Sequence, residues 1–202
     1  MNATASVADR LLAVAADCFA RDGFDAVSVR DITSRARANL GAVTYHFGSK
    51  EALFHAVIER AGTTFVARFT ALAAEPGAPL DRIGRIVAMV LTDPTLPAAM
   101  ILRELATDRP LPPPMLRLMQ RNLGTMAMLI REGQRDGSIV RGAPELLAMS
   151  VMAQPFLLRI GSRIPRDVAG VDRADPRTQR RLVTHVVSII RRSLATHAGR
   201  RS

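Results

Sequence analysis

Three features of the amino-acid sequence predict an all-α protein. Apolar residues recur at helical spacing, as Leu11, Ala15 and Phe19 do in the first helix expected. Residues typical of helix ends punctuate these segments, for example Ser28 before one helix and Gly137 after another. No stretch shows the sustained period-two alternation of a half-buried strand.

The first fifty residues predict three helices, at 5–22, 28–35 and 39–45. Gly23 can end the first helix, and Phe24 can pack back beneath its last turn. Ser28 is a suitable N-cap for the second helix, with Asp31 in place of the glutamate usual in a capping box. Helix, glycine-aromatic corner, helix, turn and short helix is the order of a three-helix DNA-binding head.

The third segment is the one that we expect to contact another molecule. Asn39 is expected to be its N-cap, and Leu40, Val43 and Phe47 are expected to form an apolar seam that faces inward. A helix this short is not stable alone, so neighbours must hold it. Its other side carries small, polar and aromatic residues: Asn39, Gly41, Thr44, Tyr45 and His46. We interpret it as the recognition helix of a helix-turn-helix.

Phosphate contacts are expected at the two helix N-termini beside this segment. Free N–H groups and the positive end of the helix dipole attract anions there. Lys50, the only lysine of the chain, stands at such an end, and the Tyr45 hydroxyl suits a phosphate oxygen. The candidate DNA-binding residues are Ser28, Arg30, Asn39, Leu40, Gly41, Thr44, Tyr45, His46 and Lys50.

The same residues carry a family resemblance over about 5–60. The run Leu11-Leu12…Cys18-Phe19…Gly23-Phe24…Ser28-Val29-Arg30-Asp31-Ile32…Gly41-Ala42-Val43-Thr44-Tyr45-His46-Phe47-Gly48-Ser49-Lys50-Glu51-Ala52-Leu53 resembles the N-terminal signature of the TetR/AcrR family of bacterial transcriptional repressors. The resemblance implies an all-helical homodimer whose C-terminal domain binds a small molecule and thereby releases DNA. The family usually has Leu at Val43 and Tyr at Thr44. The second position faces DNA in the family, so the departure suggests a different base or phosphate contact.

Beyond the head, the pattern predicts further helices and a second, larger domain. We expect the helices at 49–73, 80–92, 95–107, 114–136, 143–161 and 176–196, with a loop over 161–175. The first of them begins beside the recognition segment and is expected to link the two domains mechanically. The expected domains are a helix-turn-helix DNA-binding domain at 1–50 and a ligand-binding and dimerisation domain at 51–202.

The second domain is where we expect a small, largely apolar effector to bind and release the protein from DNA. Eight of the nine methionines lie there, and methionine can line adaptable apolar cavities, although it also simply fills cores. Polar residues that interrupt apolar faces can contact a ligand or another side chain. The candidate ligand-binding residues are Phe65, Met100, Glu104, Met119, Asn122, Met126, Gln154 and Phe156.

The last two long helices carry more apolar surface than one small domain needs to bury. We therefore expect them to form a two-fold four-helix interface, with Leu146, Met149 and Val186 among its residues. The expected partners are double-stranded DNA, a second copy of the chain and an unidentified small molecule.

Other classes of protein fit the sequence less well. It lacks the phosphate loop, the HExxH motif and the nucleophile constellation that an enzyme would need, and His46 has no metal-ligand partners at suitable spacing. We expect no enzymatic activity, no catalytic or metal site and no cofactor. A single cysteine and no run of 18 apolar residues suggest a cytoplasmic protein away from membranes. A constitutive DNA-binding or scaffold protein without a ligand is the alternative.

The net charge of +10 does not by itself locate a nucleic-acid site. Residues 1–60 carry seven basic and seven acidic side chains, so the whole excess lies in residues 61–202. Arginines that coat a solvated surface explain most of it. The charge indicates a general attraction to polyanions.

Overall fold

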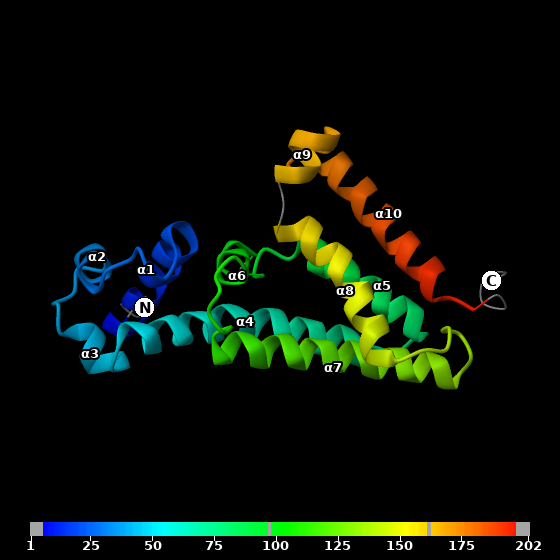
Figure 1. The fold of residues 1–202 in the computed structure, drawn as a ribbon, viewed down its shortest axis with the longest axis horizontal. Coiled ribbons are helices and arrows are strands. Elements are labelled where there is room, and N and C mark those ends of the chain that lie inside the picture. Colours follow the sequence, from blue (N-terminus) through cyan, green and yellow to red (C-terminus); the bar gives the residue numbers. More distant parts are fainter. Residues whose placement is uncertain (1–5, 97, 161–162, 197–202) are drawn as a thin grey trace, which may run out of the picture. The chain divides into compact units, whose positions relative to one another are not determined.

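A computed structural model describes residues 6–96, 98–160 and 163–196, which form ten helices and no strand (Figure 1). The all-α prediction is therefore confirmed. None of the described helices is long and apolar enough to cross a membrane. The helices are α1 (Val7–Asp22), α2 (Val29–Arg35), α3 (Ala42–Phe47), α4 (Lys50–Ala74), α5 (Pro79–Thr92), α6 (Ala98–Leu105), α7 (Pro113–Arg135), α8 (Pro144–Ile160), α9 (Arg163–Ala169) and α10 (Pro176–Leu194).

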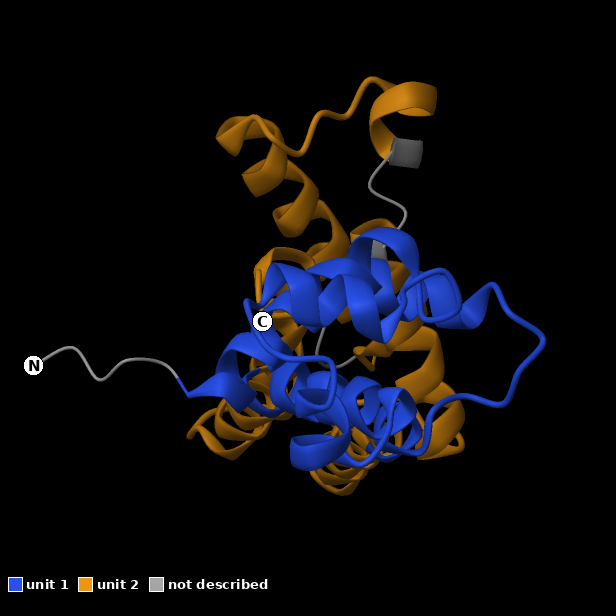
Figure 2. Ribbon diagram, turned by 90° about the vertical axis from the view of Figure 1, so that its left-hand side faces the viewer, with its two compact units in different colours: residues 1–64, 97–117 blue, residues 65–96, 118–202 orange. Residues whose placement is uncertain are grey.

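The helices group into two compact units, which Figure 2 colours separately. Unit 1 comprises residues 1–64 and 97–117, and unit 2 comprises residues 65–96 and 118–202. Helices α4 and α7 each contribute residues to both units. The functional division at residue 50 stays a prediction.

Aromatic rings form the core of unit 1. Phe19, in the last turn of α1, packs edge-on against Phe54 of α4 with ring centroids 4.9 Å apart. Phe24 follows the glycine corner, and its centroid lies 5.0 Å from that of Phe54 and 6.0 Å from that of Phe19. Gly23 allows the chain to turn back here. Its φ is 85°, in the left-handed region that residues with a side chain rarely adopt. The predicted packing of Phe24 under α1 is thus confirmed.

Helix α5 is the centre of unit 2, because α8 and α10 both pack against it. Ile83, Ile86, Val87 and Leu91 of α5 are fully buried, which is more than one face of the helix. Gly84 allows the close approach of α10, since a Cβ there would lie 3.3 Å from Cγ1 of Val187.

Val186 of α10 was expected in an interface between two chains, and its 1% exposure corrects that expectation. Its side chain belongs to the core of unit 2, together with Ile190 and Leu194 on the same helix face. The sequence pattern showed the apolar face of α10 correctly. It did not show that α5 covers that face.

Several predicted boundaries were close and three were not. Helix α3 begins at Ala42 instead of Asn39, and α6 occupies Ala98–Leu105 instead of 95–107. Thr95 lies in a turn before α6, where its N–H donates to the Asp93 carboxylate. Helix α9 lies inside the predicted loop. Residues 5 and 161, at the ends of two predicted helices, lie outside the described residues.

Two glycines of α7 provide a matched test of the packing in unit 2. A Cβ on Gly133 would lie 2.5 Å from Cγ1 and Cδ1 of Ile139, whereas a Cβ on Gly124 has no atom within 4 Å. Gly124→Ala should stabilise the chain by about 1 kcal/mol through helix propensity. Gly133→Ala should destabilise it by about 1–3 kcal/mol because the core becomes overpacked. Urea denaturation followed by circular dichroism measures both, and equal stabilisation by the two changes would contradict the packing described.

Candidate nucleic-acid interface and effector domain

Helix α2 is held by a complete capping box at its N-terminus. The Ser28 hydroxyl accepts the N–H of Asp31, and the Asp31 carboxylate accepts the N–H of Ser28 at 3.2 Å. The Ser28 hydroxyl also donates to the Asp31 carboxylate, and this bond, together with the one from the Ser28 N–H, lowers the pKa of the Asp31 carboxyl. The box was predicted correctly from the sequence. Ser28 is exposed but already engaged by Asp31, while the exposed Arg30 lies one residue inside the helix.

The turn between α2 and α3 is tight and hydrogen-bonded. Arg37 adopts a left-handed conformation with φ of 51°, and the N–H of Ala38 donates to the carbonyl of Thr33. Thr33 is buried, and its hydroxyl donates to the carbonyl of Val29 at 3.0 Å. These bonds fix the angle at which the chain enters α3.

Helix α3 is anchored by two small apolar residues, its last residue Phe47 is half-buried, and the three residues between are exposed. Ala42 and Val43 are buried. Thr44, Tyr45 and His46 are exposed, with Tyr45 84% exposed and its ring edge-on to that of His46. A single-turn helix with an anchored back and a free polar, aromatic face is suited to reading a groove.

Two expectations about the start of α3 were wrong. Asn39 does not cap the helix: its carbonyl accepts the N–H of Ala42, and Gly41 is the N-cap. Leu40 does not face inward and is 61% exposed, because it lies in the turn before the helix and helical spacing does not extend to it. Ala42 fills the inward position instead.

Gly48 and Ser49 connect α3 to α4 as expected. Gly48 has φ of 85°, and the Ser49 hydroxyl accepts the N–H of Ala52 in the first turn of α4. Lys50 then lies with its Nζ 4.4 Å from the ring centroid of Phe24. This cation–π contact was not expected from the sequence, and it ties the lysine to the aromatic core of unit 1.

Helix α6 belongs to unit 1, where it packs against α1. The Nε of Arg103 donates to the carbonyl of Ala20 at 3.1 Å, near the end of α1. Met100 and Glu104, both expected near a ligand, are therefore placed in the unit that contains α3. Glu104 is buried, which raises the pKa of its carboxyl, while the guanidinium of Arg109 at 3.7 Å acts in the opposite direction.

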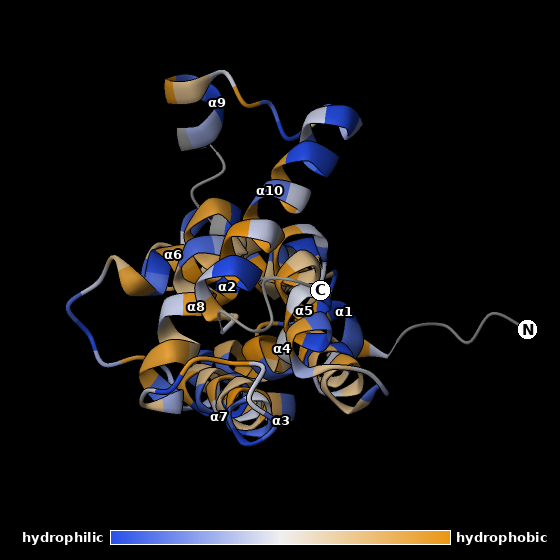
Figure 3. Cartoon of the chain, turned by 90° about the vertical axis from the view of Figure 1, so that its right-hand side faces the viewer, coloured by the Kyte–Doolittle hydropathy of each residue, from blue (hydrophilic) through white to orange (hydrophobic). Residues whose placement is uncertain are grey.

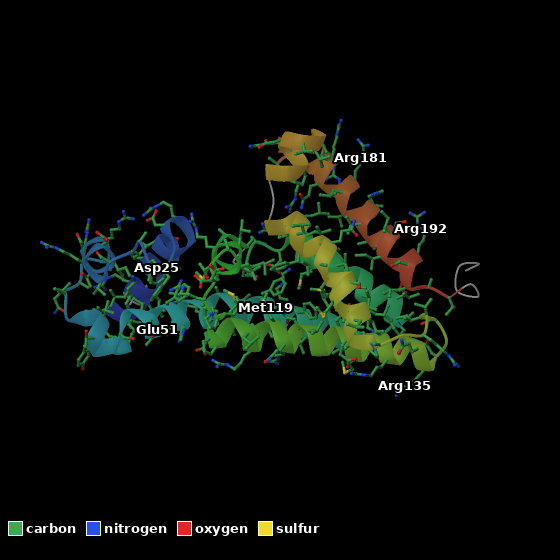
Figure 4. All side chains as sticks on the ribbon, viewed as in Figure 1. Asp25, Glu51, Met119, Arg135, Arg181 and Arg192 are labelled. Carbon is green, nitrogen blue, oxygen red and sulfur yellow. The ribbon has the colours of Figure 1, made fainter. Side chains whose placement is uncertain are left out.

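Unit 2 contains the other predicted ligand-binding residues. Phe65 and Met126 are buried, Asn122 and Phe156 are half-buried, and Gln154 is exposed. Met119, labelled in Figure 4, is half-buried on α7. Along α7, Met126 is buried, whereas Met119 and Asn122 are more accessible.

Two partly buried arginines of unit 2 were not among the candidate residues predicted from the sequence. Arg159 of α8 and Arg173, in the segment before α10, both reach carbonyls near the C-terminus of α5. A sequence signal existed for the first: Arg159 stands three residues after Phe156 and seven after Met152, so it continues an apolar helix face.

Part of unit 1 is similar to known regulatory proteins. The family model described as "Bacterial regulatory proteins, tetR family" matches residues 11–57, which run from α1 into α4. An HTH-type transcriptional repressor of Mycobacterium tuberculosis (strain H37Rv) is 42% identical over 89 residues, 43% of this chain and 47% of that protein. The chain thus spans about half the length of the curated relatives it matches.

Solved structures match the fold over nearly the whole chain. The regulator FadR of Bacillus subtilis, solved with stearoyl-CoA, has a TM-score of 0.74 at 15% identity and covers 91% of this chain and 97% of its own. A putative transcriptional regulator of Saccharomonospora viridis, solved with choline, has a TM-score of 0.73 at 23% identity and covers 94% and 98%. At such identities the likeness shows the fold alone.

The residues of the matched segment are those that build the helix-turn-helix, from the Phe19 core to the start of α4. The all-helical fold around it is also that of solved tetR-family proteins. Residues 11–57 thus match the tetR family of bacterial regulatory proteins, and the fold of the whole chain is similar to that of solved tetR-family proteins.

Proposed function

We propose that this protein is a transcriptional regulator, most simply a repressor, that binds an inverted-repeat operator and is released from it by a small molecule. The observation that carries the proposal is α3, where Ala42 and Val43 are buried while Thr44, Tyr45 and His46 are exposed. Hydroxyl, phenol and imidazole groups can contact base edges and phosphates in the major groove. The relative from M. tuberculosis, named a transcriptional repressor, supports the same role.

A homodimer is part of this proposal, since an inverted repeat needs two recognition helices related by a two-fold axis. Helix α8 supports it with an exposed apolar stripe. Leu146, Met149, Ala153 and Leu157 follow one another at spacings of three and four residues and are all exposed. Large side chains left exposed along one helix face favour self-association.

The effector is proposed to bind in unit 2. Support comes from the half-buried Met119, Asn122 and Phe156, which stand at the edge of a well-packed core. Structural relatives solved with stearoyl-CoA and with choline demonstrate that this fold can hold chemically different ligands. A constitutive DNA-binding protein is the alternative, and its DNA complex would resist every compound of a metabolite library.

The contributions of Thr44 and Lys50 to DNA binding should differ in kind. Thr44→Ala should relax the preference at one or two base pairs. Lys50→Gln should weaken binding to all sequences alike and lower the slope of log K against log salt by about one. Fluorescence anisotropy on duplexes selected from a random pool measures both effects between low and moderate salt.

Lys50→Arg, which keeps the charge, is the control for the lysine and should retain the slope. Thermal unfolding of each variant checks that loss of the contact with Phe24 has not unfolded unit 1. An altered base preference with an unchanged salt slope in Lys50→Gln would contradict the phosphate contact.

The α8 stripe should determine the oligomeric state. Leu146→Arg combined with Met149→Arg should convert dimers to monomers, because each change places a charge in an apolar interface. Val168→Arg is the matched control, since Val168 is apolar and 81% exposed but lies on α9, outside the stripe. Sedimentation velocity measures the masses. A double variant that remains dimeric would place the interface elsewhere.

Effector response should depend on the half-buried residues of unit 2. Once a library compound releases DNA, Asn122→Leu and Phe156→Ala should shift its dose-response to higher concentration and leave ligand-free DNA affinity nearly unchanged. The expected coupling free energy between effector binding and DNA binding is roughly 1–3 kcal/mol. Met128→Ala, at an exposed methionine of α7, is the control. Unshifted responses in both test variants would exclude this part of the unit.

A further inference from the structure

Arg173 connects three helices of unit 2 at the C-terminal ends of α5 and α8. Its Nη2 donates to the carbonyl of Leu91 at 2.6 Å, its Nη1 to the carbonyl of Leu158 at 2.8 Å, and its Nε to the amide oxygen of Gln179 at 3.3 Å. Carbonyls at helix C-termini are natural acceptors for arginine. All three acceptors are neutral, so the guanidinium charge is not compensated by these bonds.

Arg159 brings a second charge to the same place. Its Nη2 donates to the carbonyl of Asp93 at 3.3 Å, and its Nε is buried without a hydrogen-bond partner. Burial lowers the pKa of Arg173, and the nearby positive charge of Arg159 lowers it further.

No acidic residue within the described ranges forms an ion pair with Arg159 or Arg173. The nearby carboxylate of Asp93 is completely buried and already engaged: it pairs with Nη1 of Arg68 at 2.7 Å and accepts the hydroxyl of Thr95 at 2.6 Å. Arg68 pairs with that carboxylate, whereas Arg159 and Arg173 contact the backbone carbonyls of Asp93 and Leu91. Partly buried cations without a counter-charge are costly unless an anion joins them.

The surroundings of Arg159 are apolar along its own helix. Met152, Phe156 and Arg159 are spaced by four and three residues, share one face of α8 and are all half-buried. The buried face beside it, formed by Ala148, Val151 and Pro155, belongs to the helix that packs against α5. An apolar strip thus ends at an arginine whose donors are incompletely used.

We propose that Arg159, with Arg173 behind it, binds the oxyanion of the effector, a carboxylate or phosphate joined to an apolar group that lies against Met152 and Phe156. The inference rests on the proposed function in one respect, namely that unit 2 takes a small-molecule effector. A guanidinium fork binds such oxyanions bidentately, with geometric specificity as well as charge. A purely structural role accounts for the three hydrogen bonds of Arg173 and leaves the buried Nε of Arg159 unexplained.

Direct binding to the full chain tests this site without DNA. Sodium octanoate serves as the probe with both an oxyanion and an apolar group, octanol lacks the charge, inorganic phosphate lacks the apolar group, and choline chloride has the opposite charge. Isothermal titration calorimetry at constant ionic strength measures each. Octanoate should bind at least about tenfold more tightly than octanol, and choline should give no saturable heat.

Variants assign the effect to one side chain. Arg159→Gln should weaken octanoate binding at least about tenfold and leave octanol binding unchanged, and Arg159→Lys should recover part of the loss. Arg181→Gln is the matched control: it removes the same charge from the exposed side of α10 and should bind octanoate like the unmodified chain (Figure 4). Thermal unfolding confirms that the variants are folded, and the comparison of octanoate with octanol needs no variant.

Each other outcome has a definite meaning. Phosphate that binds as tightly as octanoate and is lost in Arg159→Gln would support the oxyanion site and overturn its apolar extension, making free phosphate the source of the anion. The proposal would be overturned if Arg159→Gln bound octanoate as tightly as the unmodified chain does. It would also be overturned if the unmodified chain bound octanoate no more tightly than octanol, or did not bind octanoate at all. Sequence-specific DNA binding by the same preparations would then leave the regulator function standing, whereas its loss would refute that function separately.

Discussion

The contact among Phe19, Phe24 and Phe54 is the interaction on which the DNA-binding head depends. It joins the end of α1 and the adjacent glycine corner to the first turns of α4, which lie far along the sequence. Aromatic rings supply large buried area with defined geometry, so few residues suffice to fix three segments. Helix α3 is only six residues long, and it keeps its orientation because Val43 and Ala42 insert into the head that these rings hold together.

Unit 2 is organised around the central helix α5. That helix is buried on most of its circumference, so α8 and α10 must both cover it. Helix α10 consequently carries two kinds of surface: hydrophobic residues such as Val186 and Ile190 that face the core, and hydrophilic residues such as Arg181 and Arg192 on the outer side (Figures 3 and 4). The apolar stripe of α8 that remains uncovered follows from the same geometry, because α5 covers only one side of α8.

The arginines, which carry all of the chain's basic side-chain charge except that of Lys50, serve several distinct purposes. Arg103 and Arg173 satisfy carbonyls at helix ends, and Arg82 is buried, with its guanidinium bonded to the carbonyl of Ala73 and to Glu132. Long side chains with a planar group of five donors are suited to such cross-links between helices. Net charge therefore indicates little about nucleic acid here, and the exposed residues of α3, which carry no arginine, are better evidence for a DNA-binding role.

Local sequence signals determined the helices, the capping box at Ser28, the corner at Gly23 and the outward face of Thr44, Tyr45 and His46, because each depends on residues within a few positions of one another. Tertiary structure alone decided which apolar faces are covered within the chain. Val186 and Leu40 had the same kind of apolar pattern, yet α5 buries the first and the turn before α3 exposes the second. Two of the three partners of Arg173, the carbonyls of Leu91 and Leu158, lie 82 and 15 residues away along the chain, and no helical periodicity can encode contacts at such separations. The proximity of Arg173 to Arg159, and the uncompensated charge that results, depend on how α5, α8 and α10 converge.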